Sequence, residues 1–397
     1  MKKIRVGVLF GGRSGEHEVS LLSAASVLKA MDPEKYEAVA IGITKDGRWV
    51  TAAHAERLLR GETAHEARPL RAGDPETTPG AAVLARGEAI IVPPVPSHSQ
   101  SGIVPFQTGN DAPTRRWTDH AIHVDVVFPV LHGTFGEDGT IQGLLELADL
   151  PYVGAGVLGS SAGMDKDVMK QLFRAAGLPI VKHVTVLRSD WESDRKRAQR
   201  TIESKLKYPV FVKPANLGSS VGISKAHDRA ELPGCMDEAA KFDRKIVVEQ
   251  AVGGKRQKAR ELECSVLGND RPQASLPGEV VPVKEFYDYA AKYLEEGSQL
   301  LIPAPLNKQE TRKVQEMAMR AFRAVDCAGL ARVDFLMEPR SRKIYVNEIN
   351  TMPGFTSISM YPKLWAASGL PYSELIDRLI QLGLERHADK RQNQYSR

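Results

Sequence analysis

The order of apolar and polar positions divides the chain into strands and helices. Residues 4–10 form a short apolar run, which is typical of a buried strand, and apolar residues then recur at helical spacing from Leu21 to Leu28. A second run at 39–43 completes a β-α-β pattern. The segment 61–123 is rich in Pro, Gly, Ser and Thr with little periodicity, so we expect an elaborated or partly mobile insertion without chemistry of its own. The pattern resumes with a buried strand at 124–131, and we place the end of the first unit, 1–154, soon after it.

A second unit is predicted at 155–253. Asp165 suits the N-cap of a helix that runs to Ala176 and is ended by Gly177 and Pro179. Four strands are expected after it, at 184–187, 208–214, 222–226 and 245–250. This order favours an α+β unit over a doubly wound sheet.

A third unit is predicted at 254–397. Asn307 and Glu310 have the spacing of a capping box before a helical pattern that reaches Val325. A strand at 329–337 is separated by the polar turn EPRSR from the strand-like start of the stretch 346–362, which predicts a hairpin.

Composition narrows the classes of function. A length of 397 residues suggests two or three domains, and a net charge of +5 is small for that length. The basic run 195–200 lacks interleaved aromatic residues and is expected to be a solvated helix face, so no nucleic-acid partner is predicted. Three cysteines without metal-ligand or redox spacing favour reduced thiols and a cytoplasmic location. Glycines interrupt the N-terminal apolar run, and no long apolar stretch follows, so neither a signal peptide nor a membrane partner is expected.

The predicted hairpin carries the first candidate chemistry. Side chains two residues apart share one face of a strand, so Glu348 and Asn350 project together. A turn at Ser341 would place Asp334 opposite Glu348 and Arg332 opposite Asn350. Facing carboxylates repel unless a cation intervenes, and Mg²⁺ takes such oxygen ligands together with water and nucleotide phosphates. Taken alone, the pattern fits a metal site and a solvated face with Arg332 salt bridges equally well.

The stretch VFVKPANLGSSVG at 210–222 supports the nucleotide interpretation. A strand ends at Lys213 and enters a loop of small residues whose backbone N–H groups can close over phosphates. It lacks the Gly-Lys-Ser/Thr ending of a P-loop, and a simple hairpin turn is the alternative. Lys166 and Lys170 lie one helical turn apart, and Lys166 could reach a phosphate, although isolated lysines are more often surface residues.

The loop GGRSGEHEVS at 11–20 joins the first strand to the first helix, which is a common place for a ligand. It is not GxGxxG, and the second strand ends without an acidic residue, so a dehydrogenase is disfavoured. Glu16 either compensates the helix dipole or pairs with a substrate ammonium. His132, at the end of a buried strand, is either structural or close to a ligand.

Seven motifs, in this order, resemble those of the D-alanine:D-alanine ligase family. They are LFGGRSGEHEVSL, LHGTFGEDGTIQGLLEL, GMDKDVMK, VKPANLGSSVG, EFYDYAAKYL, ARVDF and NEINTMPGFTSISMYP. The resemblance covers nearly the whole chain except 61–123. It implies an α/β and α+β multidomain protein of the ATP-grasp fold with an N-terminal Rossmann-like βαβ domain. It also implies an enzyme that spends ATP to join two D-alanines through an acyl phosphate, for the cell-wall precursor.

The resemblance implies the cofactor site residue by residue. Asp334, Glu348 and Asn350 would hold two Mg²⁺ ions, with Mn²⁺ as an alternative ion. ATP would be contacted by Lys166, Lys213, Ser219, Ser220, Glu249, Glu261, Phe286, Lys292 and Asn350. Among these, Glu249 would meet the adenine amino group, Glu261 the ribose, Phe286 the purine ring and Lys292 the transferring phosphoryl group.

The resemblance likewise implies the substrate contacts. Glu16 would pair with the ammonium of the first D-alanine, and Ser359 would receive the carboxylate of the second. Arg332 and the Gly354 N–H would stabilise the oxyanion. His132 and Met360 would complete the substrate site.

The stretch EFYDYAAKYL resembles the family's mobile loop, which we place at 284–302 and which would exclude water from the acyl phosphate. Tyr293 on this loop would meet Ser219 and, through it, Glu16. Ligases that favour D-lactate carry phenylalanine at this tyrosine, so Tyr293 supports D-alanine. The family forms homodimers, and the resemblance implies the same here.

Three alternatives differ in residues that this chain contains. A D-alanine:D-lactate ligase is disfavoured by Tyr293. Another ATP-grasp carboxylate-amine ligase would not require Glu16 and Tyr293. A nucleotide-binding regulatory protein would not require Arg332, Lys292 and both metal carboxylates.

Overall fold

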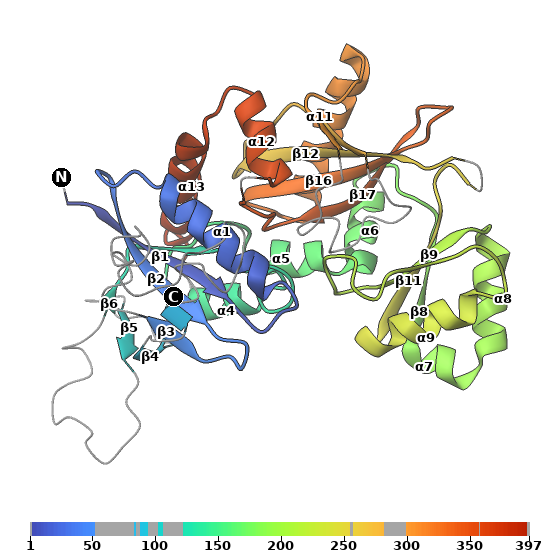
Figure 1. Ribbon diagram of the computed structural model, residues 1–397, viewed down its shortest axis with the longest axis horizontal. Helices are drawn as coiled ribbons and strands as arrows, with labels where there is room; N and C mark the ends of the chain where they lie inside the picture. The colour runs from blue at the N-terminus through green and yellow to red at the C-terminus, as the bar shows by residue number, and fades with distance from the viewer. Residues whose placement is uncertain are drawn as a thin grey trace, which may run out of the picture.

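The computed structural model describes residues 2–51, 83–84, 88–93, 102–105, 122–254, 257–281, 299–356 and 358–394. Three sheets organise this part of the chain (Figure 1). The predicted site residues Phe286, Lys292 and Tyr293 lie outside the described residues.

The first sheet has seven strands in the order β6-β5-β4-β3-β2-β1-β7. They are β1 (Ile4–Gly11), β2 (Tyr36–Ile43), β3 (Trp49–Thr51), β4 (Glu88–Ile91), β5 (Gly102–Pro105), β6 (Ile122–His123) and β7 (Val126–Pro129). The helix α1 (His17–Ala30) joins β1 to β2, and β1 pairs in parallel with both β2 and β7, which confirms the predicted β-α-β opening. The other strand pairs are antiparallel. Since β4, β5 and β6 come from 61–123, that segment extends the sheet and is not simply an insertion outside it.

The second sheet is antiparallel, in the order β10-β9-β11-β8. Its strands are β8 (His183–Leu187), β9 (Val210–Pro214), β10 (Ser224–Ala226) and β11 (Lys245–Gln250). Three helices, α7 (Arg188–Ser193), α8 (Arg195–Lys205) and α9 (Leu232–Phe242), bury their apolar residues on one face of the sheet. Because side chains alternate along a strand, Lys213 and Glu249 project from the opposite face.

Three helices lead from the first sheet to the second, namely α4 (Thr140–Leu147), α5 (Val157–Met164) and α6 (Lys166–Ala175). The Asp165 carboxylate accepts hydrogen bonds from the backbone N–H groups of Asp167 and Val168, so the predicted N-cap of α6 is confirmed. This cap fixes the start of α6, and with it the direction in which Lys166 and Lys170 leave the helix.

The third sheet has the path β15-β14-β12-β16-β17, with β13 beside β12. Its strands are β12 (Arg260–Gly268), β13 (Gln273–Ala274), β14 (Gly278–Val281), β15 (Gln299–Leu301), β16 (Gly329–Met337) and β17 (Ile344–Asn350). The helix α11 (Lys308–Ala324) begins with the predicted Asn307–Glu310 capping box and covers one face. The helix α12 (Met360–Ala367) lies on the other. The predicted mobile loop, 284–302, includes β15 near its C-terminal end. Residues 282–298 are outside the described part.

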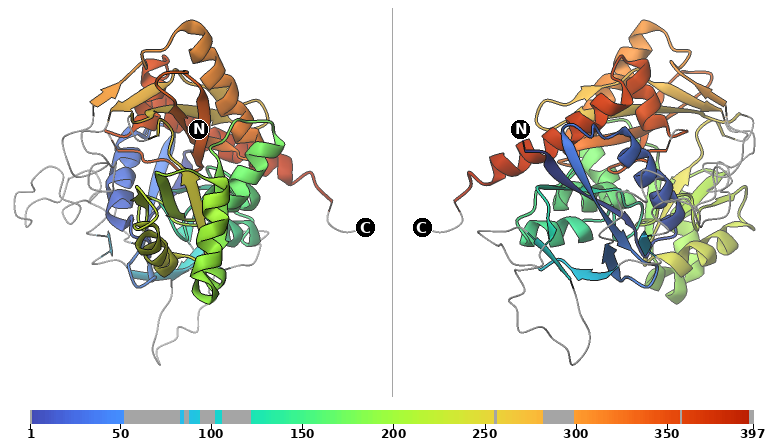
Figure 2. Two further views of the ribbon diagram at one scale, coloured as in Figure 1. Left: turned by 90° about the vertical axis from the view of Figure 1, so that its right-hand side faces the viewer. Right: turned by 60° about the vertical axis from the view of Figure 1, so that its left-hand side comes forward.

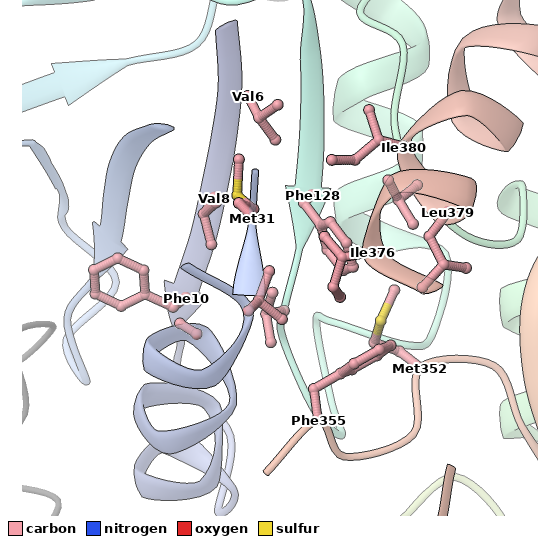
Figure 3. Packing of buried hydrophobic residues seen from close by; sticks show 14 of the residues in the cluster. Val6, Val8, Phe10, Met31, Phe128, Met352, Phe355, Ile376, Leu379 and Ile380 are labelled. Carbon is pink, nitrogen blue, oxygen red and sulfur yellow. The ribbon is translucent and has the colours of Figure 1, made fainter. Parts of the chain in front are cut away.

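The C-terminal helix α13 (Tyr372–Lys390) joins the first and third sheets into one core. Figure 3 shows Ile376 and Leu379 of α13 beside Phe128 of β7, with Met352 and Phe355 next to them. The rings of Phe128 and Phe355 meet edge to face at 5.7 Å between centroids. Figure 2 shows the same helix running beside the first sheet. The segment 351–356, which carries Gly354, is therefore held in place by packing from both sheets.

Among the helices of the described residues, none combines the length and the apolar character needed to cross a membrane.

Candidate active site

The hairpin of β16 and β17 has the predicted pairing at its functional end. Arg332 lies opposite Asn350, and Asp334 lies opposite Glu348. The register shifts between Asp334 and Phe335, so that Asn347 forms a bulge that the turn-based prediction did not include. The bulge lies on the turn side of the four residues and leaves them on one face.

A third carboxylate joins this face from β12. Glu263 lies opposite Asp334 on the side away from Glu348, which gives a row of three acidic residues across three adjacent strands. Sequence reasoning missed Glu263. The alternation of Glu261 and Glu263 along a strand was a usable signal, but only the sheet order shows which strand β12 adjoins.

Arg332 bridges two members of that row. Its Nε and Nη2 atoms donate to the two carboxylate oxygens of Asp334, at 2.7 Å each, and Nε lies 3.0 Å from Oε2 of Glu263. Asn350 donates from Nδ2 to Asp334 at 3.0 Å. The facing carboxylates and the Arg332 ion pairs occupy the same face, so the two interpretations of the hairpin do not exclude each other. The metal site itself stays a prediction.

The donor set on this face suits Mg²⁺. Asp334 and Glu348 supply carboxylate oxygens and Asn350 an amide oxygen, which are hard ligands of the kind that Mg²⁺ prefers. Across the described ranges, no group of three or more His, Cys, Asp or Glu residues is arranged to hold a metal ion. With two carboxylates and one amide, several positions on an ion would be left for water and phosphate oxygens, as is usual for nucleotide-bound Mg²⁺.

Two buried lysines face these carboxylates from the neighbouring unit. Lys166 is 7% exposed and Lys213 is 9% exposed. The alternative that Lys166 and Lys170 lie at the surface is wrong, because Lys170 is also buried, at 1% exposed. Burial lowers the pKa of Lys166, although the charge of Glu348 partly offsets this effect. Burial also acts to lower the pKa of Lys213, but Glu249 and Glu348 outweigh it and raise that pKa. Lys166 donates from Nζ to the Leu217 carbonyl at 2.7 Å, which ties the start of α6 to the loop after β9.

Glu249 lies between two lysines. Its carboxylate oxygens are 2.8 Å from Nζ of Lys170 and 2.8 Å from Nζ of Lys213. Burial alone would raise the pKa of Glu249, but the two ammonium groups hold it well below its usual value. The contact of Glu249 with adenine stays a prediction. The ion pair with Glu249 orients the Lys213 ammonium group.

Lys170 also bonds to the hairpin, because its Nζ donates to the carbonyl of the bulged residue Asn347 at 3.0 Å. Sequence reasoning named Lys170 but gave it no role. The structure makes it the link between Glu249 and the strand that carries Glu348.

Glu16 lies next to the loop that carries Ser219 and Ser220. A Cβ atom on Gly218 would come 3.6 Å from Oε1 of Glu16, and one on Gly133 would come 3.0 Å from Oε2. Glu16 is 8% exposed, so two glycine-containing loops enclose its carboxylate. Ser219 and Ser220 both have left-handed backbone conformations, with φ of 48° and 60°. Such conformations are uncommon for serine and often occur at functional sites.

His132 holds the segment that contains Gly354. Its Nδ1 is 3.0 Å from the Met352 carbonyl and its Nε2 is 3.0 Å from the Ser23 hydroxyl, which also accepts the Phe355 N–H at 3.3 Å. Burial lowers the pKa of His132 to about 4, so the ring is neutral at pH 7. A neutral ring with Nδ1–H donates to Met352 and accepts from Ser23. These bonds favour the structural alternative for His132, which acts on the site through this segment.

Glu137 is a further residue that sequence reasoning missed. Its carboxylate accepts the N–H of Gly133 at 2.7 Å and the N–H of Met352 at 3.2 Å, and so joins the first unit to the third. Burial, followed by repulsion from Glu16, raises the pKa of Glu137 to about 8. Its place in the motif HGTFGEDG was the available signal.

Ser359 and Met360 differ in which of their groups could contact a substrate. Ser359 precedes α12 and bonds to Thr356, with its hydroxyl accepting the Thr356 N–H at 3.1 Å. It therefore stands at a helix start, where backbone N–H groups can receive a carboxylate. The Met360 side chain is buried against Gly278 with Val280 and Leu364, so a substrate contact would have to come from its backbone.

The fold and the site together define an ATP-grasp protein. An antiparallel sheet with buried lysines faces a second antiparallel sheet with two carboxylates and an amide, and the unit that opens with β-α-β adds Glu16 beside the loop that contains Gly218.

Comparisons with known proteins identify the family. Residues 5–155 match the family model described as D-ala D-ala ligase N-terminus, and residues 172–381 match D-ala D-ala ligase C-terminus. The D-alanine--D-alanine ligase of Heliobacterium modesticaldum is 49% identical over 99% of this chain and 98% of its own length. That of Natranaerobius thermophilus is 48% identical over the same shares of the two chains. The chain therefore belongs to the D-alanine–D-alanine ligase family.

Solved structures agree with this family. The D-alanine-D-alanine ligase from Coxiella burnetii has a TM-score of 0.78 and 35% identity, and the match covers 99% of this chain and 97% of that one. The VanG D-Ala:D-Ser ligase from Enterococcus faecalis has a TM-score of 0.79 and 34% identity, with 96% and 100% covered. The match to the N-terminal family model spans 61–123, so this segment lies within the bounds of that domain.

Proposed function

We propose that this protein joins two D-alanine molecules into D-alanyl-D-alanine at the expense of ATP, for synthesis of the peptidoglycan precursor. The observation that carries the proposal is one face of the third sheet, where Asp334 and Glu348 lie opposite each other with Asn350 beside them. The charge of Glu348 acts to raise the pKa of both Lys166 and Lys213. The names of relatives that align over nearly their whole length support the same reaction.

The reaction has two covalent steps. A carboxylate oxygen of the first D-alanine attacks the γ-phosphorus of ATP, the bond to ADP breaks, and an acyl phosphate forms. The amine of the second D-alanine then attacks the acyl carbon, phosphate leaves with the electrons of the C–O bond, and the nitrogen loses a proton as the peptide bond forms.

The residues of this chain bind and orient the reactants in these steps. Glu16, enclosed by two glycine-containing loops, would hold the ammonium of the first D-alanine. Lys166 and Lys213 would hold phosphate oxygens of ATP. Arg332 and the Gly354 N–H would face the oxygen that becomes negative when the amine attacks. Mg²⁺, when bound by Asp334, Glu348 and Asn350, would supply positive charge that offsets the charge of the phosphates.

Further parts of the proposal concern the binding site for ATP and the second substrate. Ser219 and Ser220 would close over the phosphates, Glu249 and Glu261 would lie near adenine and ribose, and Ser359 would receive the carboxylate of the second D-alanine.

The remaining parts concern organisation. We propose domains at 1–154, 155–253 and 254–397, two Mg²⁺ ions for each site with Mn²⁺ as an alternative, a homodimer, and a cytoplasmic location. The three sheets support the domain division, and the family resemblance supports the metal ions and the homodimer. The free cysteines support the cytoplasmic location.

A product assay tests the proposed reaction. Purified protein is incubated with Mg²⁺, ATP and D-alanine, alone or mixed with D-serine or D-lactate, with L-alanine as the stereochemical control. We expect ADP release and D-alanyl-D-alanine as the main product in every mixture that contains D-alanine, and no product from L-alanine. A larger yield of the mixed D-serine or D-lactate product would overturn the assigned second substrate, and no ADP release would overturn the reaction itself.

A further inference from the structure

We propose that Glu263 is a positioning residue that keeps the Arg332 guanidinium on the sheet face of Asp334 while Asp334 binds a divalent cation. This inference rests on the proposed function of the site. It assigns a role to a residue that sequence reasoning did not single out.

The sheet geometry brings the two side chains together. Glu263 lies directly opposite Asp334, and Ser265 lies opposite Arg332, so Glu263 and Arg332 are diagonal neighbours on one face. Nε of Arg332 is 3.0 Å from Oε2 of Glu263. Glu263 is 8% exposed, and the Arg332 side chain is 15% exposed, so water screens this ion pair only weakly.

Arg332 and a divalent cation require the same carboxylate. Both oxygens of Asp334 accept bonds from Arg332 at 2.7 Å, and a metal ion at Asp334 would repel a guanidinium held there. Glu263 offers the guanidinium a second carboxylate on the same face. Arg332 can therefore shift its main contact from Asp334 to Glu263 and stay near the position where the oxyanion develops.

The charge of the row supports the same role. On this face of the sheet, the three carboxylates of Glu263, Asp334 and Glu348 lie beside one guanidinium, that of Arg332. Removing the negative charge of Glu263 therefore weakens the attraction of the row for a divalent cation. Glu263 thus acts on the metal through charge and on Arg332 through contact.

The same sheet provides a matched control on its other face. Glu279 of β14 is buried and accepts two bonds from Arg260, at 2.7 and 2.6 Å. Glu279 lies opposite Leu262, a core residue, so this second Glu–Arg pair is on the α11 side of the sheet and not on the face that carries Asp334. Glu279→Gln therefore makes the same chemical change, with similar burial, away from the site.

The experiment compares Glu263→Gln with Glu279→Gln. Binding of Mn²⁺ is followed by the electron paramagnetic resonance signal of the free ion in the presence of a non-hydrolysable ATP analogue, and kcat, the KM for D-alanine and the melting temperature are measured beside it. For Glu263→Gln we expect Mn²⁺ binding to weaken about fivefold and kcat to fall about tenfold or more, less than the loss of a whole oxyanion donor. For Glu279→Gln we expect a lower melting temperature with wild-type Mn²⁺ affinity.

The result that overturns the inference is wild-type Mn²⁺ affinity and kcat in Glu263→Gln, or losses in both variants that simply follow the melting temperature. If Glu263→Gln does not fold, Glu263→Asp replaces it in the test, because aspartate keeps the negative charge on a shorter side chain. It should retain Mn²⁺ affinity and lose kcat, and the opposite outcome would refute the role. If wild-type protein binds Mn²⁺ with the nucleotide but releases no ADP with D-alanine, the proposed function fails while the metal measurement still tests Glu263.

Discussion

Replacing Lys170 by methionine tests the buried charges that connect α6 to the hairpin. The Lys170 side chain is 1% exposed and bonds to Glu249 at 2.8 Å and to the Asn347 carbonyl at 3.0 Å. Methionine fills a similar volume, and Glu249 then keeps its ion pair with Lys213. Removing one partner of a buried ion pair typically costs about 3–5 kcal/mol, and because Lys213 still compensates part of the Glu249 charge, we expect a loss near the lower end of that range. For a cooperative unit of this kind, that loss corresponds to a melting temperature lower by on the order of 10 °C.

The assay is thermal melting of the nucleotide-free protein, with ATP-dependent turnover measured beside it. Lys241→Met is the matched control, because Lys241 pairs with Glu238 at 2.6 Å on an exposed helix surface, where such pairs contribute about 0–1 kcal/mol. The double variant Lys170→Met with Glu249→Gln should lose less stability than the sum of the single changes, since the buried carboxylate that has lost one of its two cations is then gone. We also expect a higher KM for ATP in Lys170→Met, because Glu249 helps to place Lys213.

The reasoning would be refuted by a Lys170→Met protein that melts within about 2 °C of wild type, as the exposed control should. It would also be refuted by additive losses in the double variant. Either outcome would mean that Glu249 is not stabilised by Lys170 to the extent that the buried geometry implies.

Two further predictions concern single residues. Glu348→Gln should lower turnover at least a hundredfold, because it removes a carboxylate that would hold the metal ion. The melting temperature should stay near that of wild type, because the change also relieves the repulsion from Asp334. Near-normal turnover would contradict the metal role. Burial lowers the pKa of His132 from 6.5 to about 4 in the folded protein. Below pH 6.5 the unfolded chain therefore binds a proton that the folded protein does not bind. The free energy of unfolding should fall by on the order of 3 kcal/mol as the pH drops from 6.5 to 4. The difference in melting temperature between wild type and His132→Asn should therefore shrink from pH 7 to pH 4, and a constant difference would count against a neutral buried ring.

Several features of the site could be predicted because they depend on residues close in sequence. The N-cap at Asp165, the capping box of Asn307 and Glu310, and the facing pair Asp334 and Glu348 all follow from spacing along a helix or across a short turn. The bulge at Asn347 escaped prediction because a turn alone does not reveal an extra residue in one strand.

Other features could not be predicted because they depend on how distant strands are ordered. Glu263 contacts Arg332 because β12 lies beside β16. Lys170 contacts both Glu249 and the Asn347 carbonyl because α6 approaches β11 and β17. Isolated lysines are usually exposed, so sequence reasoning gave Lys170 no role. The strands within 61–123 were missed for a related reason, since their short and aperiodic sequences become strands by pairing along the edge of an existing sheet.

The sequence by itself determined the local frame of this protein: which residues form the hairpin, which helices begin at which caps, and which motifs mark the family. Only the tertiary structure decided which charges meet, because burial and distance between groups far apart in the chain follow from the packing of three sheets and not from local spacing. Glu16 beside Gly218, Glu249 between two lysines, and Arg332 between Asp334 and Glu263 are arrangements of that second kind. Their energies depend on low exposure and short separations, which exist once the sheets have come together.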